Sequence, residues 1–459
     1  MNGPLIKRME RVSDNKIKRR MTQKIVLVAL SLGAVVFLLV GCVEKPVFRE
    51  EVYPPQIKQP AVTVKLLETN NGLNVSSHGS FVIKCSPLQG EPSTYYASAE
   101  MLVELSEAGI SITQKFQGEL EAKLDKVLFL PVKESSYLYL NGIPYRGALK
   151  ISRIDNSGML LVLNAVFVED YLKGVIPAEM GKLSRQEEEA LKAQAVAART
   201  YALFCLGQHA DEGYDLEATV ADQIYQGKNG EDALANQAVE LTRGEVLTHQ
   251  GKLICAYYHA NSGGKTEFIE KVWDKPKQAY LIPVDDSEFC SWSESFRWME
   301  NWTKEILEGN LKRFFATYDN FQNEEFGNLL DVQIKKRSPS GRVEELDVLT
   351  QRGSHLIRGD RIRWAMGKGS NHKSILPSTC FDLEIERGID GSIQRVVARG
   401  RGNGHGVGMC QIGAMGMARK GWSYQDILTF YYSSVELVPS YGKHKSGKKE
   451  QALLSSSVN

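Results

Sequence analysis

Residues 169–208 read EDYLKGVIPAEMGKLSRQEEEALKAQAVAARTYALFCLGQ, and within this stretch the hydrophobic pattern changes from that of strands to that of helices. Residues 185–208 are rich in Ala, Leu and Glu, which are strong helix formers. Ser184 and Glu187 have the S-x-x-E spacing of a capping box, so we expect the helix to begin there. It carries small side chains that would let another backbone approach closely, and we therefore predict that it is buried. These are Ala193, Ala195, Ala197, Ala198 and Ala202.

The residues before this stretch are typical of β-structure. Between residues 61 and 168, short apolar runs such as AVTVKLLE, SFVIKC and YLYLNGIPYRGALKISRI are separated by turn signals. Two of the turns are Asn141-Gly142 and Asn156-Ser157-Gly158. We therefore predict a β-rich N-terminal part.

The residues after it mix helices with strands. A second helix is predicted over 303–321, and Ser423 and Asp426 cap a short helix that runs to Tyr431-Tyr432. The predicted strands are Val332–Ile334, Val343–Val348 and Cys380–Ile385, with turns at Pro339-Ser340-Gly341 and Asp390-Gly391. Because strands and helices come in blocks and do not alternate strictly, we predict the α+β class, a mixed core with a β-rich N-terminal part.

The length and charge of the chain exclude some classes of protein function. A chain of 459 residues has room for two or three domains, and its composition of 42% hydrophobic and 24% charged residues is that of an ordinary globular protein. The net charge is +1, but residues 1–24 alone carry eight Lys or Arg against two acidic side chains. Without residues 1–41 the chain is mildly acidic and has no later basic cluster, which argues against nucleic-acid binding.

The N-terminus is expected to hold the protein at a membrane. Residues 25–41 have no charged side chain and follow the basic stretch, the order of an export signal or a single membrane anchor. The segment ends in Leu39-Val40-Gly41-Cys42, which resembles a lipobox, and Cys42 would then be the acylated residue. We predict an extracytoplasmic protein anchored by this Cys42 or by one transmembrane helix.

The predicted domains follow from these patterns. They are an anchor at 1–42, a proline-containing tether at 43–60, the β-rich region at 61–149, a main region at 150–437 and a Ser/Lys-rich disordered tail at 438–459.

Six cysteines remain after Cys42: Cys85, Cys205, Cys255, Cys290, Cys380 and Cys410. An even count permits three disulfides in an exported chain, but no regular spacing supports a framework. Cys205 lies in the predicted helix, where a buried thiol is the simpler interpretation. The pairing stays open.

Glu179 is a candidate general acid. It lies between Pro177 and the capped helix, and its neighbours Ile176, Ala178 and Met180 are apolar. An apolar environment raises the pKa of a carboxyl group, as a general acid near neutral pH requires. An ordinary exposed glutamate before a helix is the alternative from the sequence alone.

Residues 400–414 are a second candidate for a functional segment. Five glycines at every second position from Gly400 to Gly408 leave one face bare, so that a ligand or another backbone can come close. His405 at its centre could donate to a substrate, bind a metal or satisfy a buried carbonyl. The segment is neither a P-loop nor a dinucleotide fingerprint.

Two polar-aromatic segments complete the set, residues 222–227 (DQIYQG) and 257–266 (YYHANSGGKT). Both suit a cleft that holds sugars by stacking and hydrogen bonds, and both could be turn chemistry alone. His259 has no thiols at close spacing, so we see no zinc pattern and predict no metal.

Taken together and in order, these segments resemble the stage II sporulation protein D family, whose domain is shared with the amidase enhancer proteins. The resemblance covers residues 150–437. It rests on EDYLKGVIPAEM, ALKAQAVAARTYAL, DQIYQG, YYHANSGGKT, SGRV, IRGDRIR and GRGNGHGVGMCQIGAMGMARKGWSYQDILTFYY.

The resemblance implies an exported lytic transglycosylase that cleaves peptidoglycan glycan strands after an amidase has removed the stem peptides. The family's catalytic glutamate corresponds to Glu179. The expected substrate-binding residues are Arg199, Gln223, Tyr225, Asn261, Ser262, Gly263, His405 and Gln411.

The implied reaction needs one carboxyl group, because the attacking group is a hydroxyl of the substrate itself. Protonated Glu179 would donate to the oxygen between N-acetylmuramic acid and N-acetylglucosamine. Its carboxylate would then accept the proton of the muramic C6 hydroxyl as a 1,6-anhydro ring closes. No cofactor is expected. Asn403 and Cys410 depart from the family's usual aromatic residue and serine.

Two other functions remain open. One is a non-catalytic amidase enhancer, which binds the wall and activates an N-acetylmuramoyl-L-alanine amidase. The other is a scaffold that contacts envelope proteins through residues 43–149. The expected partners are therefore glycan strands, a cell-wall amidase, envelope proteins and the membrane. Sporulation, division and general wall turnover are equally compatible with the sequence.

Overall fold

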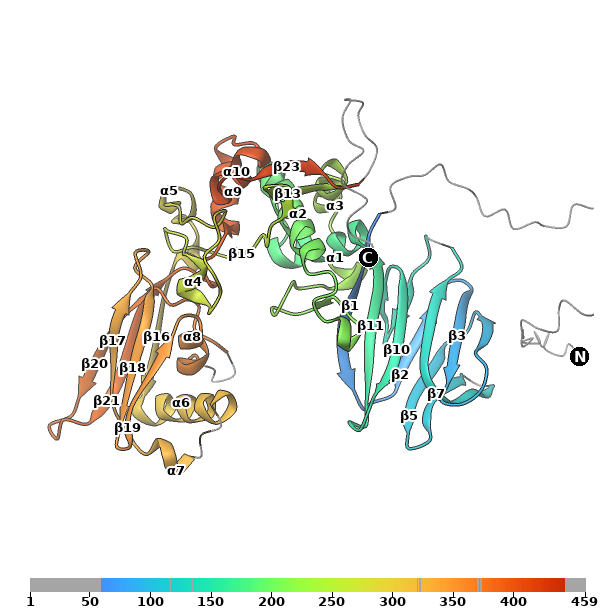
Figure 1. Cartoon of the computed structure of the whole chain (residues 1–459), viewed down its shortest axis with the longest axis horizontal. Helices are drawn as coiled ribbons and strands as arrows, with labels where there is room; N and C mark the ends of the chain where they lie inside the picture. Colours follow the sequence, from blue (N-terminus) through green and yellow to red (C-terminus); the bar gives the residue numbers. More distant parts are fainter. Residues whose placement is uncertain are drawn as a thin grey trace, which may run out of the picture. The chain divides into compact units, whose positions relative to one another are not determined.

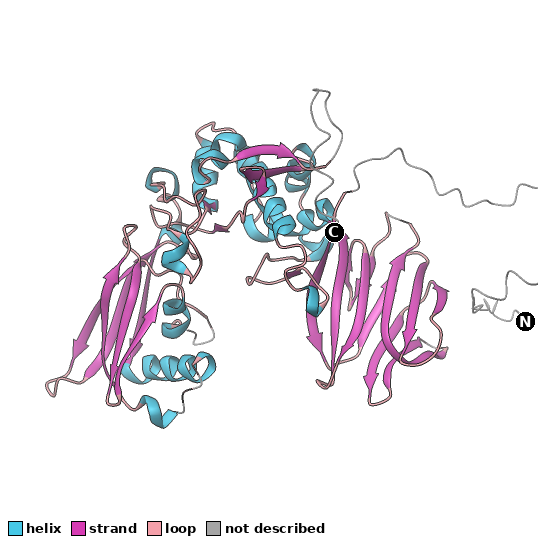
Figure 2. Ribbon diagram, viewed as in Figure 1, coloured by secondary structure: helices cyan, strands magenta, loops and turns pink. Residues whose placement is uncertain are grey.

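The computed structural model describes residues 59–441 apart from 116, 134, 320, 322, 370, 372 and 373. It contains 27% helix and 38% strand, with a curled mixed sheet and separate helices, which confirms the α+β class. Figure 2 colours these elements. The chain forms two compact units that exchange segments. Of the described residues, unit 1 holds those from 59 to Val175, Cys205–Gly230 and Tyr441, and unit 2 holds those in Ile176–Phe204 and Glu231–Ser440.

Unit 1 is built on one sheet of twelve strands. Its strands are β1 (Ala61–Thr69), β2 (Leu73–Ser77), β3 (Phe81–Pro87), β4 (Ser93–Ala97), β5 (Met101–Ser106), β6 (Gly109–Gln114), β7 (Gly118–Pro131), β8 (Leu138–Leu140), β9 (Ile143–Tyr145), β10 (Ala148–Ile154), β11 (Met159–Phe167) and β12 (Leu216–Glu217). The order is β12-β1-β11-β10-β7-β6-β5-β2-β8-β9, and β3 pairs with β4 and β7. All pairs are antiparallel except β1 with β12.

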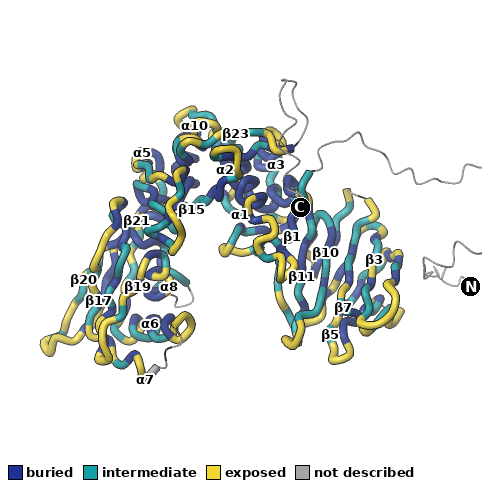
Figure 3. The backbone as a smooth tube through the Cα atoms, in the orientation of Figure 1, coloured by how far each residue is buried: buried dark blue, intermediate teal, exposed yellow. Residues whose placement is uncertain are grey.

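Apolar and polar residues that alternate in the sequence lie on opposite faces of this sheet. In β3, Phe81, Ile83 and Cys85 are fully buried while the residues between them are not, because side chains along a strand point to opposite faces. The turn at Asn141-Gly142 joins β8 to β9 with positive φ at both residues, the geometry that a two-residue hairpin favours. The β-rich N-terminal part is thus present as predicted. Figure 3 shows buried and exposed residues along the chain.

The compact units do not follow the boundary predicted between residues 149 and 150. That position lies inside β10, which pairs with β7 and β11 and so belongs to the sheet. Residues 205–230 also return to unit 1, where β12 extends the sheet beside β1. The boundary between the two units depends on strand pairing between segments that are distant in the sequence. Local composition cannot predict such pairing.

The described residues also contain helices and short 3-10 turns. They are α1 (Val168–Met180), α2 (Glu188–Phe204), α3 (Ala233–Leu241), α4 (Ile269–Val272), α5 (Ser287–Cys290), α6 (Lys304–Tyr318), α7 (Asn323–Phe326), α8 (Arg361–Met366), α9 (Gln411–Arg419) and α10 (Tyr424–Tyr431), with 3-10 turns η1 (Arg185–Glu187), η2 (Ala210–Glu212), η3 (Gly227–Gly230) and η4 (Glu294–Phe296). The capping box of Ser184 and Glu187 is present and opens η1, which leads directly into α2. The five alanines of α2 are fully buried, as predicted.

The remaining strands of unit 2 form small sheets. They are β13 (Glu245–His249), β14 (Lys252–Leu253), β15 (Tyr258–His259), β16 (Arg297–Thr303), β17 (Leu329–Arg337), β18 (Val343–Thr350), β19 (Gly353–Arg358), β20 (Phe381–Arg387), β21 (Ile393–Arg401), β22 (Met409–Cys410) and β23 (Glu436–Pro439). The sheets β16-β21-β20 and β17-β18-β19 share one apolar core with α6 and α8, centred on Trp302, Leu346 and Val396 (Figure 1).

The C-terminal end of the described chain is part of the fold. Residues 438 and 439 lie in β23 and Tyr441 is buried, so the first residues of the predicted tail belong to the fold, and 442–459 lie outside the described residues. The predicted anchor, Cys42 and most of the tether also lie outside them. Within the described part of the chain, no helix is long and apolar enough to cross a membrane.

Candidate active site

Glu179 lies in the last turn of α1. The helix contains Pro177 and ends after Met180, where Gly181 takes a left-handed conformation with φ of +72° and donates to the carbonyl of Pro177 at 2.9 Å. Glu179 itself is half-buried. A glutamate at a helix end, with part of its surface still accessible, can meet a ligand without a rearrangement of the fold.

Gln411 reaches this carboxyl group from α9. Its Nε2 donates to Glu179 Oε2 at 3.5 Å. Gln411 is the first residue of α9, and the side chain of Cys410 caps that helix by accepting from the backbone N–H of Gly413. The structure therefore brings together two of the predicted site residues, Glu179 and Gln411, which are 232 positions apart in the sequence.

The glycine-rich segment packs against residues 257–263. β15 and β22 form a short parallel ladder, and Asn261 and Asn403 exchange backbone hydrogen bonds of 2.8 Å. A side chain at Gly408, whose φ is +73°, would place its Cβ only 2.0 Å from the carbonyl oxygen of Tyr257. The bare face predicted for this segment is thus occupied by the chain's own backbone.

His405 is held by the main chain at both ring nitrogens. Nδ1 accepts from the N–H of Val407 at 3.1 Å, so Nε2 carries the proton and donates to the carbonyl of Tyr258 at 2.9 Å. Burial lowers the pKa of His405 to about 4. The sequence left three roles open for His405: donation to a substrate, metal binding, or a hydrogen bond to a buried carbonyl. This geometry favours the hydrogen bond to a buried carbonyl.

A half-buried aromatic cluster surrounds this histidine. The ring of Trp273 lies 4.8 Å from that of His405 and 5.0 Å from that of Tyr257. Lys275 is exposed, donates to the Tyr257 hydroxyl at 2.7 Å and lies over both rings. The cluster offers flat apolar faces beside a cation.

Asn261, Ser262 and Gly263 form a buried turn. Asn261 accepts from the N–H of Gly263 at 2.9 Å, and Ser262 accepts from the N–H of Gly264 at 2.9 Å. The side chains of Asn261 and Ser262 are almost fully buried. Their contacts shape the loop that packs beside β22, and their predicted contact with substrate stays a prediction.

Arg199 lies wholly inside unit 2. Its guanidinium donates to the carbonyls of Glu245 at 3.1 Å and Val239 at 3.2 Å, which ties α2 to the end of α3 and the start of β13. These contacts give Arg199 a structural role in the support of α2.

Gln223 and Tyr225 lie in unit 1 and are buried there. Gln223 accepts from the hydroxyl of Tyr171 at 3.1 Å, and Tyr225 donates to Asn164 at 2.8 Å. Gly174 in α1 packs against the Tyr225 ring so closely that no Cβ would fit. Both residues therefore support α1, the helix that carries Glu179.

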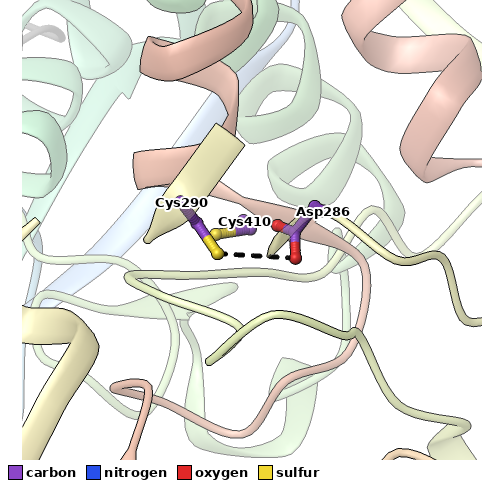
Figure 4. Close-up of side chains that lie close together, drawn as sticks. All are labelled: Asp286, Cys290 and Cys410. Atoms are coloured by element: carbon purple, nitrogen blue, oxygen red, sulfur yellow. Dashed lines mark hydrogen bonds between the residues drawn. The ribbon is translucent and has the colours of Figure 1, made fainter. Parts of the chain in front are cut away.

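The sequence analysis missed one group of side chains. Asp286, Cys290 and Cys410 are buried, and one ligating atom of each lies within 4.8 Å of the others (Figure 4). Sequence spacing gave no sign of this cluster, because Cys410 is 120 or more positions from its partners and joins them only in the fold. The six cysteines of the described residues are all buried free thiols, which includes the thiol predicted for Cys205.

Known proteins share sequence similarity with this chain. Residues 156–249 match the family model described as stage II sporulation protein. The chain is 28% identical over 285 residues to the stage II sporulation protein D of Bacillus amyloliquefaciens, over 59% of this chain and 74% of that protein. The chain belongs to the stage II sporulation protein D family. The family predicted from the ordered motifs is thus confirmed.

Two further matches extend the family assignment. The chain is 33% identical over 305 residues to an uncharacterized protein of Brachyspira hyodysenteriae, over 65% of this chain and 73% of that protein. It is 29% identical over 330 residues to the amidase enhancer of Bacillus subtilis, over 66% of this chain but 45% of that protein. Residues 290–408, which include the shared core of the two three-stranded sheets, match a domain family of unknown function.

Proposed function

We propose that this protein is a lytic transglycosylase that cleaves peptidoglycan glycan strands between N-acetylmuramic acid and N-acetylglucosamine and leaves 1,6-anhydro ends. The observation that carries the proposal is the placement of Glu179, which is half-buried at the end of α1 with the Gln411 amide at its carboxyl group. The family to which the chain belongs supports the same conclusion.

Glu179 lies at the end of α1, where part of its surface is accessible to a ligand. The Gln411 amide donates to this carboxyl group at 3.5 Å. Once Glu179 has given its proton to the glycosidic oxygen, this amide hydrogen bond stabilises the carboxylate that accepts the C6 hydroxyl proton.

The aromatic cluster supplies a place for sugar rings. Tyr257 stands just before β15 and Gln411 just after β22, and the two strands run parallel. At about 3.3 Å per residue, the cluster and Gln411 lie roughly 10 Å apart along this ladder. We propose that Tyr257 and Trp273 stack on the glycan strand, in agreement with the sugar-binding role predicted for residues 257–266.

A second function is favoured by one comparison. The alignment with an amidase enhancer covers 66% of this chain, so a chain that binds glycan and stimulates an amidase without cleaving the strand is a specific alternative. In both cases we propose that the protein acts outside the cytoplasm, on the cell wall, anchored through Cys42 or through residues 25–41.

The test is product analysis by mass spectrometry after incubation of the purified full-length chain with amidase-treated peptidoglycan. Wild type should release anhydro-muramyl products, and Glu179→Gln should release none while its tryptophan fluorescence shows a folded protein. Glu188→Gln, a control glutamate at the start of α2, should stay active. If folded wild type releases no product, and wild type and Glu179→Gln stimulate an amidase equally, the transglycosylase proposal is wrong. The protein would then be a non-catalytic amidase enhancer.

A further inference from the structure

Asp286 is a buried carboxyl group without a cation. It is fully buried, and within the described residues none of the ion pairs includes it. Its partners are neutral: Oδ1 accepts from the hydroxyl of Ser262 and from Cys290 Sγ at 3.6 Å, and Oδ2 accepts from the hydroxyl of Tyr431 at 2.9 Å. A buried carboxylate is costly unless a positive charge balances it.

Two thiols lie close to this carboxyl group. Figure 4 shows the Cys290 side chain directed toward Asp286 and the Cys410 sulfur beside that of Cys290, and all three residues are fully buried. Asp286 and Cys290 come from α5 and the residue before it, and Cys410 comes from the N-terminal cap of α9. Two sulfurs and a carboxylate are a ligand set that zinc accepts.

The spacing also fits. A tetrahedral zinc ion with Zn–S of about 2.3 Å and Zn–O of about 2.1 Å places a sulfur and an oxygen ligand about 3.6 Å apart. Cys290 Sγ and Asp286 Oδ1 are 3.6 Å apart. All three proposed ligand atoms lie within 4.8 Å of one another.

The hydrogen bonds around the three side chains also suit a metal site. Cys410 Sγ accepts from the backbone N–H groups of Ser262 and Gly413, both at 3.2 Å. Such donors stabilise a thiolate bound to a metal, and hydroxyl donors such as that of Tyr431 orient a ligating carboxylate. Gly413 leaves the room for this arrangement, because a Cβ there would lie 2.7 Å from Asp286 and 2.0 Å from the Tyr431 hydroxyl.

We propose that Asp286, Cys290 and Cys410 bind a structural zinc ion, with a water molecule in the fourth position. On binding, the two thiols release their protons to solvent and become thiolate ligands. The ion would join α5 to the start of α9, and the Ser262 hydroxyl would stay hydrogen-bonded to Asp286. Because Gln411 follows Cys410 directly, zinc would also hold the amide that contacts Glu179.

The first test is the metal content of the full-length chain, purified under reducing conditions without chelator. We expect one zinc ion per chain by inductively coupled plasma mass spectrometry. After replacement of zinc by cobalt(II), the wild-type protein should show near-ultraviolet sulfur-to-cobalt charge-transfer absorption and the visible bands of a tetrahedral site. This spectrum needs no variant, and neither measurement depends on glycan cleavage, so failure here is distinct from failure of the proposed function.

Variants then assign the ligands. Cys290→Ser and Cys410→Ser should each weaken zinc binding by at least about tenfold, whereas Cys255→Ser, which removes a buried thiol outside the cluster, should leave it unchanged. A folded wild-type chain that binds no zinc and gives no cobalt–sulfur absorption would overturn the proposal, because the cluster would then be hydrogen-bonded thiols. A Cys290–Cys410 disulfide in the protein as isolated would overturn it as well.

Discussion

Acidification should destabilise unit 2 through His405. Burial lowers the pKa of this histidine from 6.5 to about 4 in the folded protein. As the pH falls below 6.5, the unfolded chain binds a proton that the folded chain does not, so stability is lost between pH 6.5 and pH 4. Between pH 7.5 and pH 5 the contribution of this one ring is at most about 2 kcal/mol.

The assay compares wild type with His405→Gln. The glutamine amide keeps an acceptor and a donor for the backbone groups of Val407 and Tyr258 but does not titrate. All six tryptophans lie in residues 231–440, so their fluorescence in urea follows the unfolding of unit 2 alone.

We expect wild type to lose up to about 2 kcal/mol more than His405→Gln between pH 7.5 and pH 5. The difference between the two proteins removes the contribution of carboxyl groups that both share. It also removes most of the contribution of His259, whose pKa burial lowers in the same direction. His209→Gln, in unit 1, should behave as wild type. Equal pH dependence of wild type and His405→Gln would refute the enclosure of the ring.

Two further predictions concern the elements that position the site. Gly408→Ala combines a left-handed φ of +73° with a Cβ 2.0 Å from a carbonyl oxygen, so it should cost at least about 3 kcal/mol of unfolding free energy. Gly421→Ala, with φ of +85° and open space, should cost only about 1–2 kcal/mol, and equal losses would contradict the close packing at Gly408. Ser184→Ala removes the cap before α2 and should lower stability by about 1 kcal/mol in the same urea assay; an unchanged midpoint would mean that the cap contributes nothing.

Local signals predicted the elements on which the site stands. The capping box at Ser184, the alanines of α2 and the Asn141-Gly142 turn each act over a few residues, and each is present in the fold. Ser423 also caps α10 as predicted, by accepting from the N–H of Asp426. Such features could be read from the sequence because the residues that make them are neighbours in it.

Long-range contacts could not be predicted in this way. The return of residues 205–230 to the sheet of unit 1 depends on β12 pairing with β1, about 150 positions away. The role of His405 depends on the carbonyl of Tyr258, and the cluster at Asp286 depends on Cys410. The family resemblance predicts Glu179 and Gln411 as site residues, but only the fold shows that their side chains are in contact.

In the proposed reaction, Glu179 activates a hydroxyl of the substrate itself and not water. The most direct measurement is mass spectrometry of products formed from amidase-treated peptidoglycan in water enriched in oxygen-18. We predict 1,6-anhydro-muramyl ends without the heavy isotope, and no such ends with Glu179→Gln. Reducing ends that carry oxygen-18 would show attack by water and contradict the account.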